Sequence, residues 1–136
     1  MTTQSTIYEL AGGEATFVAL VDAFYEGIMS DEVLRPMYPP ELTAAKRHLT
    51  LFLIQYFGGP TTYSDERGHP RLRMRHAPFI VNEDARDRWL THMNAAISRV
   101  ELPEDARVAM SNYFASTADF LINQQRKIKL APASSD

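Results

Sequence analysis

The chain has 136 residues, a formal net charge of −3 at pH 7 and no cysteine, and 45% of its residues are hydrophobic. This length and composition predict one domain with one core. The absence of cysteine excludes disulfides, thiolate metal sites and a cysteine nucleophile. A slightly acidic chain gives no general reason to expect binding to nucleic acid or to an acidic membrane.

The N-terminal residues 1–6 contain neither a basic region nor an apolar run, so the sequence predicts no signal peptide. No stretch of the chain approaches the roughly 20 apolar residues that are needed to span a bilayer. We therefore expect a cytoplasmic protein without a membrane span.

Apolar residues recur at helical spacing in the first half of the chain and predict two long helices. The first helix has an apolar stripe of Phe17, Leu20, Val21, Phe24, Tyr25 and Ile28. Gly12-Gly13 precede this helix and allow a tight turn. Ser30-Asp31 begins a short helical turn, which Pro36 and Pro39-Pro40 interrupt.

The second long helix is predicted from Glu41 to Tyr56, and Gly58-Gly59-Pro60 ends it. Its inner face is expected to contain Ala45, Leu49, Phe52, Leu53 and Tyr56. Residues 61–68 are predicted as an irregular polar loop. A short helix that carries Leu72 and His76 follows and ends near Pro78.

Two more long helices are predicted in the second half of the chain. Asn82 provides a capping side chain for the third, and Pro103-Glu104-Asp105 begins the fourth. Their apolar stripes consist of Trp89, Met93, Ala96, Ile97 and Val100, and of Met110, Tyr113, Phe114, Thr117, Phe120 and Leu121. Residues 131–136 form a tail that we expect to be frayed. The sequence thus predicts an all-α fold, but periodicity alone does not decide how the helices pack.

Several short segments, in their order and spacing, resemble the truncated haemoglobins of the second group, an oxygen-binding subclass of bacteria. These segments are Gly12-Gly13, Phe24-Tyr25, Tyr38-Pro39, Gly58-Gly59-Pro60, residues His69 to Phe79, and Trp89. The resemblance covers roughly residues 6 to 125. It implies that residues 1–130 form one globin domain, in which two antiparallel helix pairs cross over haem b (iron protoporphyrin IX). A covalently attached c-type haem is not expected, because it needs a Cys-x-x-Cys-His segment.

A globin haem needs a neutral, oriented imidazole as its proximal ligand. The chain offers His48, His69, His76 and His92. His69 precedes a proline, which favours an extended loop, and His92 lies one residue off an apolar stripe, which is typical of packing. His76 lies at the end of the short helix and matches the family's proximal histidine, so the resemblance implies that it is the iron ligand.

The resemblance places Ala45 on the distal side of the haem, with Tyr25, Tyr38 and Trp89 over the iron. Alanine cannot donate a hydrogen bond, whereas each phenol and the indole can donate one. A donor to a charged group contributes about 1.5–3 kcal/mol. Two donors near the lower figure would slow oxygen release by on the order of a hundredfold, since about 1.4 kcal/mol is tenfold. The alternative is that the three aromatic residues only belong to the core.

The remaining candidates are expected to contact the porphyrin or its carboxylates. Apolar walls are expected from Leu49, Phe52, Leu53 and Met93, although each could equally be an ordinary core residue. Four arginines precede the proximal histidine, at positions 67, 71, 73 and 75. A solvated helix face would explain these arginines. Nucleic-acid binding is not favoured, because no aromatic residues that could stack on bases alternate with the arginines. The functional interpretation is that Arg73 or Arg75 pairs with a haem propionate. Relatives often carry an arginine or lysine at the position of His48, and His48 could contact a propionate in the same way.

Two function hypotheses follow. The first is a haem protein that binds oxygen, nitric oxide, carbon monoxide or peroxide, with slow oxygen release and a role in oxygen or nitric oxide chemistry or detoxification rather than transport. A nitric oxide dioxygenase or peroxidase-like activity would require a separate reductase, because the chain has no flavin or nicotinamide domain. The second is a cofactor-free helical interaction module. No nucleophile or metal-helix motif supports a hydrolase, and no leftover apolar stripe predicts an oligomeric state.

Overall fold

The computed structural model describes residues 5–72 and 81–122, and its regular elements there are all helical. In chain order these are α1 (Ile7–Ala11), α2 (Glu14–Met29), the 3-10 helix η1 (Arg35–Met37), α3 (Thr43–Tyr56), α4 (Thr62–Arg67), α6 (Glu83–Arg99) and α7 (Glu104–Phe120). The predicted all-α fold is confirmed. The part of the predicted short helix that carries His76, and the tail from residue 131, lie outside the described residues. Among the described helices, none is long and apolar enough to cross a membrane.

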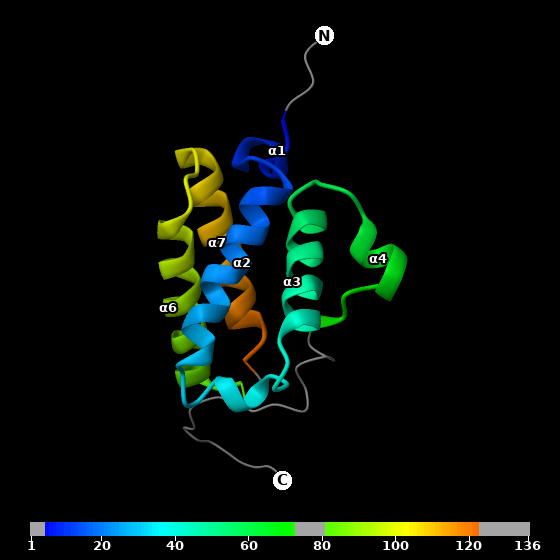
Figure 1. The fold of residues 1–136 in the computed structure, drawn as a ribbon. Helices are drawn as coiled ribbons and strands as arrows, with labels where there is room; N and C mark the ends of the chain where they lie inside the picture. The colour runs from blue at the N-terminus through cyan, green and yellow to red at the C-terminus, as the bar shows by residue number, and fades with distance from the viewer. Residues whose placement is uncertain (1–4, 73–80, 123–136) are drawn as a thin grey trace, which may run out of the picture.

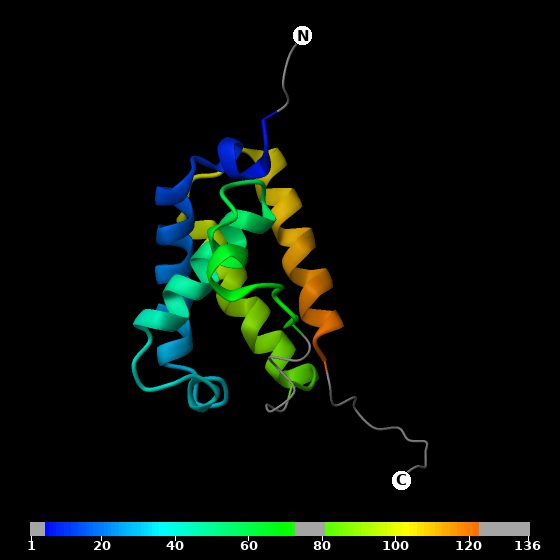
Figure 2. The same ribbon diagram turned by 90° about the vertical axis from the view of Figure 1, so that its right-hand side faces the viewer.

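The four long helices form two antiparallel pairs, α2 with α3 and α6 with α7 (Figure 1, Figure 2). Helix α2 also packs along α6, and this contact joins the two pairs. The short helix α1 lies against α7, while η1 connects the end of α2 to the start of α3 (Figure 1). This arrangement agrees with the packing of two antiparallel helix pairs that the resemblance implied.

The predicted helix starts are found where the local chemistry requires them. Gly12 and Gly13 have φ values of 112° and 78°, which side chains rarely tolerate, and α2 begins directly after them. At α6, the Asn82 side chain accepts a hydrogen bond from the Ala85 amide at 2.8 Å. Pro103 stands immediately before α7 as its N-cap rather than inside the first turn.

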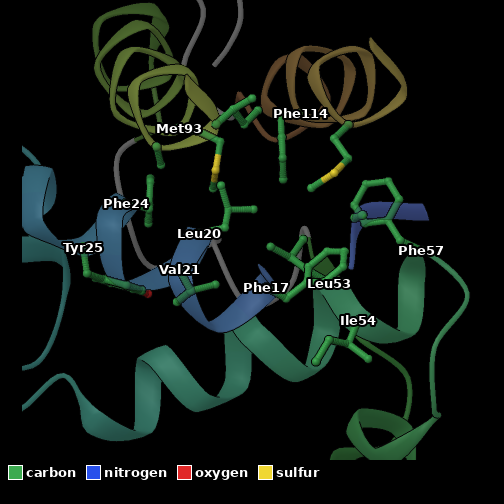
Figure 3. Close-up of a cluster of buried hydrophobic side chains, with 14 of the residues drawn as sticks. Phe17, Leu20, Val21, Phe24, Tyr25, Leu53, Ile54, Phe57, Met93 and Phe114 are labelled. Atoms are coloured by element: carbon green, nitrogen blue, oxygen red, sulfur yellow. The ribbon is translucent and has the colours of Figure 1, made fainter. Parts of the chain in front are cut away.

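The core lies where α2 meets the other long helices. Its largest fully buried side chains are Phe17, Leu20, Val21, Phe24 and Ile28 of α2, Leu53 of α3, Met93 of α6, and Met110 and Phe114 of α7. Figure 3 shows the α2 side chains between those of α3 on one side and those of α6 and α7 on the other. The stripe predicted for α2 is therefore confirmed over its whole length.

Two short helices differ from the sequence prediction. Residues 61–68, predicted as an irregular loop, contain helix α4, so that prediction is wrong. A contact with α3 that the polar sequence of α4 does not indicate holds this helix in place. The Gln55 side chain accepts a hydrogen bond from the Ser64 amide at 2.9 Å and donates one to the Ser64 hydroxyl at 2.8 Å. Helix α1 was not predicted, although Thr6 and Glu9 form a capping box at its start.

The apolar stripes predicted for α3 and α7 each include one residue near the helix end that is exposed. Tyr56 was expected on the inner face of α3 and Phe120 on that of α7, but they are 54% and 53% exposed. Near the end of α3, Leu53 is buried as predicted, together with Ile54 and Phe57, which were not predicted. The Tyr56 ring lies against the ring of Tyr113, with 4.0 Å between their centroids, so it covers the core from outside. The start of α3 is Thr43, two residues after the predicted start.

Candidate functional site

A cavity of about 270 Å³ lies among α2, α3, α4, α6 and α7 and is lined mainly by apolar and aromatic side chains. One wall comes from the end of α2 and the segment that follows it, through Phe24, Tyr25, Leu34, Met37 and Tyr38. Trp89 of α6 reaches the same cavity from the other helix pair. Residues far apart in the chain thus enclose one space.

Three polar aromatic groups meet at this wall. The rings of Tyr25 and Tyr38 make an edge contact with their centroids 5.5 Å apart. Phe24 lies 5.1 Å from both Tyr25 and Trp89, again between ring centroids. The predicted distal residues therefore form one cluster that faces a cavity.

The surroundings of Tyr25 and Tyr38 favour the protonated form of each phenol over the ionised form. Burial, and to a smaller extent the neighbouring Tyr38, raises the pKa of Tyr25 far above its usual value. Burial also raises the pKa of Tyr38 to about 12, against the opposing effect of a hydrogen bond with Trp89. Both phenols hence keep their protons at neutral pH and can donate them in hydrogen bonds.

The backbone that carries Tyr38 is braced by Arg35. Its guanidinium donates to the carbonyl oxygens of Tyr38, Pro39 and Pro40 at 3.3, 3.0 and 2.9 Å. These carbonyls could not be satisfied by regular structure, because the two prolines interrupt the helix. Arg35 thereby gives an irregular segment a defined course past the cavity.

Helices α3 and α4 form a second wall, through His48, Leu49, Phe52, Leu53 and Tyr63. Tyr63 is buried and makes an edge contact with Phe52 at 5.6 Å between centroids. His48 Nε2 lies 3.1 Å from the guanidinium of Arg67, the last residue of α4. Basic groups thus gather where α4 docks on α3.

The third wall is made by the start of α6 and the end of α7. It includes Ala85, Arg86, Tyr113, Phe114, Thr117, Ala118 and Leu121, with Leu72 and Val81 from the chain between α4 and α6. Arg86 forms ion pairs with Asp87 and with Asp119 of α7, and these raise the pKa of its guanidinium. The pair with Asp119 ties the two helices together beside the cavity.

The structure brings together most of the described candidates from the sequence. The cavity is lined by Tyr25, Tyr38, His48, Leu49, Phe52, Leu53 and Trp89. Ala45 is half-buried against the core and Met93 is fully buried within it, and neither is among the lining residues. The predicted iron ligand His76 and the predicted propionate partners Arg73 and Arg75 lie outside the described residues.

Sequence reasoning missed several lining residues. Tyr63 was missed because residues 61–68 were predicted as a loop, and Arg86 belongs to no motif that would assign it to the site. Tyr113 and Phe114 were placed on a stripe but not assigned to the site. Their helical spacing from Thr117 and Leu121 was the one signal that these side chains share a face.

Comparison with known proteins agrees with this geometry. Residues 6–123 match the bacterial-like globin family. A group 2 truncated hemoglobin of Bacillus subtilis is 40% identical over 112 residues, which cover 82% of this chain and 85% of that protein. The crystal structure of a hemoglobin from Chloroflexus aurantiacus superposes with a TM-score of 0.88 at 53% identity, covering 89% of this chain and 100% of that one.

A group II truncated hemoglobin of Bacillus anthracis superposes with a TM-score of 0.89 at 34% identity, over 93% of this chain and 98% of that structure. The family match over residues 6–123 includes all the described helices that line the cavity. In this family the fold implies a haem cofactor and haem-based oxygen binding. The chain belongs to the bacterial-like globins and, within them, to the group II truncated haemoglobins.

Proposed function

We propose that the cavity holds haem b and that the protein binds oxygen tightly and releases it slowly. Three donor groups, the phenols of Tyr25 and Tyr38 and the indole of Trp89, face a diatomic ligand. The observation that carries this proposal is their convergence, from two helices and one irregular segment, on one largely apolar cavity. The proposed proximal ligand is His76, and Arg73 or Arg75 is proposed to pair with a propionate.

The described walls fit a flat apolar ring with acidic groups at its edge. Phe24, Phe52 and Phe114 offer aromatic surface to the ring from three different helices. His48 and Arg86 are the basic residues among the described lining residues, and their donor groups suit carboxylates. When bound, haem would supply an iron centre that takes diatomic ligands.

The distal residues act by holding protons where a ligand acquires negative charge. Hydrogen bonds to charged groups contribute about 1.5–3 kcal/mol, and a buried site loses little of this to water. The Tyr38 phenol stays protonated at neutral pH, because its pKa is raised to about 12. Two such donors account for slow release without any further group.

Oxygen dissociation from the wild-type protein tests this proposal. We expect release to be at least about tenfold slower than from a Tyr25→Phe/Tyr38→Phe/Trp89→Phe variant, which keeps the three rings but none of the donors, since even one donor of about 1.5 kcal/mol gives this factor. The measurement is stopped-flow mixing of the oxygenated, haem-loaded protein with excess carbon monoxide. A release rate equal to that of the triple variant would contradict the proposal.

Slow release suits chemistry on the bound ligand better than delivery of oxygen. Oxidation of nitric oxide, or a peroxidase-like reaction, is therefore the activity that we propose to follow from binding. We propose that a separate reductase supplies the electrons that both reactions need.

A further inference from the structure

Among the described residues, Asp31 is the one charged residue that is buried, with 7% of its surface exposed, and it lies two residues after the end of α2. It does not line the cavity. Burial alone would raise the pKa of its carboxyl, but hydrogen bonds from two backbone amides and from His92, together with the Arg88 charge, outweigh burial and lower the pKa to about 2. A buried carboxylate that is ionised at neutral pH needs a structural reason.

One set of contacts fixes the turn that leads to Tyr38. Oδ1 of Asp31 accepts hydrogen bonds from the amides of Val33 and Leu34 at 2.9 and 3.0 Å. Its backbone carbonyl accepts from the Arg35 amide at 2.8 Å. Asp31 therefore begins the segment in which Leu34 faces the cavity and Arg35 braces the carbonyl of Tyr38.

The second set of contacts reaches α6 on both sides of Trp89. Oδ2 of Asp31 lies 2.8 Å from His92 Nε2, and Oδ1 lies 3.2 Å from a guanidinium nitrogen of Arg88. Arg88 is the neighbour of Trp89, and His92 follows one helical turn later. His92 also fills the space over Gly27 of α2, because a Cβ placed there would lie only 2.3 Å from His92 Nδ1.

We propose that Asp31 is a positioning residue that holds the Tyr38 segment and the Trp89 helix in one fixed arrangement around the cavity. The inference rests on the proposed function, in which Tyr38 and Trp89 donate to the bound ligand. One carboxylate fixes the positions of both donors. Both of its oxygens contact side chains of α6, and Oδ1 also accepts hydrogen bonds from the turn before Tyr38. A simple turn cap would need no contact with α6.

The test separates capping from positioning by three substitutions. Asp31→Asn keeps an oxygen that can accept from the two backbone amides, but it removes the negative charge that interacts with Arg88 and His92. Arg88→Met removes a contact from the α6 side and leaves the turn untouched. Asp84→Asn is the matched control, because Asp84 bonds the same arginine at 3.0 Å with a side chain that is 61% exposed.

Trp89 is the chain's single tryptophan, so its indole N–H gives one resonance in a nitrogen–proton correlation spectrum. We would record this resonance in the carbon monoxide-loaded, full-length protein and measure oxygen release from the same variants. The expected result is a displaced or doubled indole resonance and severalfold faster release in Asp31→Asn and Arg88→Met. Asp84→Asn should match the wild type in both measurements.

The outcomes distinguish this inference from the function on which it rests. An indole resonance that stays in place in both variants overturns the positioning role, whatever the release rates. If Trp89→Phe and Tyr38→Phe speed oxygen release, a displaced resonance with an unchanged rate of oxygen release in Asp31→Asn and Arg88→Met also overturns the positioning role. If those two variants leave release unchanged as well, the proposed donors fail while the displaced resonance still supports Asp31 as the residue that positions Trp89.

Discussion

Replacing Trp89 by phenylalanine is expected to speed oxygen release about tenfold, because a donor of about 1.5 kcal/mol is lost and ~1.4 kcal/mol is a factor of ten. Phenylalanine keeps an aromatic ring against Phe24 and Phe114, whose centroids lie 5.1 and 5.8 Å from that of the indole. The haem should therefore be retained. The cavity loses one N–H and little of its packing.

Stopped-flow oxygen displacement by carbon monoxide would measure this effect, with Tyr38→Phe and the double variant beside it. Because Tyr38 and Trp89 hydrogen-bond to each other, the two losses are coupled, and the double variant should release oxygen between about tenfold and about a hundredfold faster than the wild type. Tyr113→Phe is the matched control, because it removes a hydroxyl from the α7 wall of the same cavity. Equal rates in Trp89→Phe and the wild type would show that the indole only packs.

The second large effect is expected from Phe17→Ala, which should destabilise the protein by about 3–5 kcal/mol. Phe17 is 0% exposed, and its ring stacks between those of Tyr8 and Phe57 at 5.8 and 6.0 Å between centroids. It does not line the cavity, so truncation leaves a void in the core rather than a larger site. The loss should fall on stability and not on the ligand.

Urea unfolding of the haem-loaded protein, followed by circular dichroism, would measure the change in midpoint. Val18→Ala provides a neighbour on the same helix with a side chain that is 42% exposed, and surface changes of this kind usually stay within about 0.5 kcal/mol. An oxygen release rate close to that of the wild type is expected for Phe17→Ala. Equal midpoints for the two variants would show that this part of the core contributes little.

Much of the fold could be predicted because the four long helices satisfy local rules. The α2 stripe, the Asn82 cap and the glycines before α2 all act within a few residues of the chain. The errors arose where tertiary contacts decide. Helix α4 has no apolar period and depends on Gln55 and Ser64, and Tyr56 turns outward to lie on Tyr113 of a different helix.

The site shows the same division. Tyr25, Tyr38 and Trp89 could be named from the resemblance, and the structure places them at one cavity. The roles of Arg35 and Asp31 could not be predicted, because their partners are backbone carbonyls, amides and side chains that only the folded chain brings within reach. Residues that hold a site in place carry no motif of their own.

The measurement that tests the account most directly is the absorption spectrum of the purified protein in its ferric, dithionite-reduced and carbon monoxide-bound forms. His76→Ala is recorded beside it, with His69→Ala as the control from the same arginine-rich segment. We predict a strong Soret band and a five-coordinate reduced form in the wild type and in His69→Ala, and their loss or marked change in His76→Ala. The absence of a Soret band even after haem is added would contradict the account, as would a His76→Ala spectrum identical to that of the wild type.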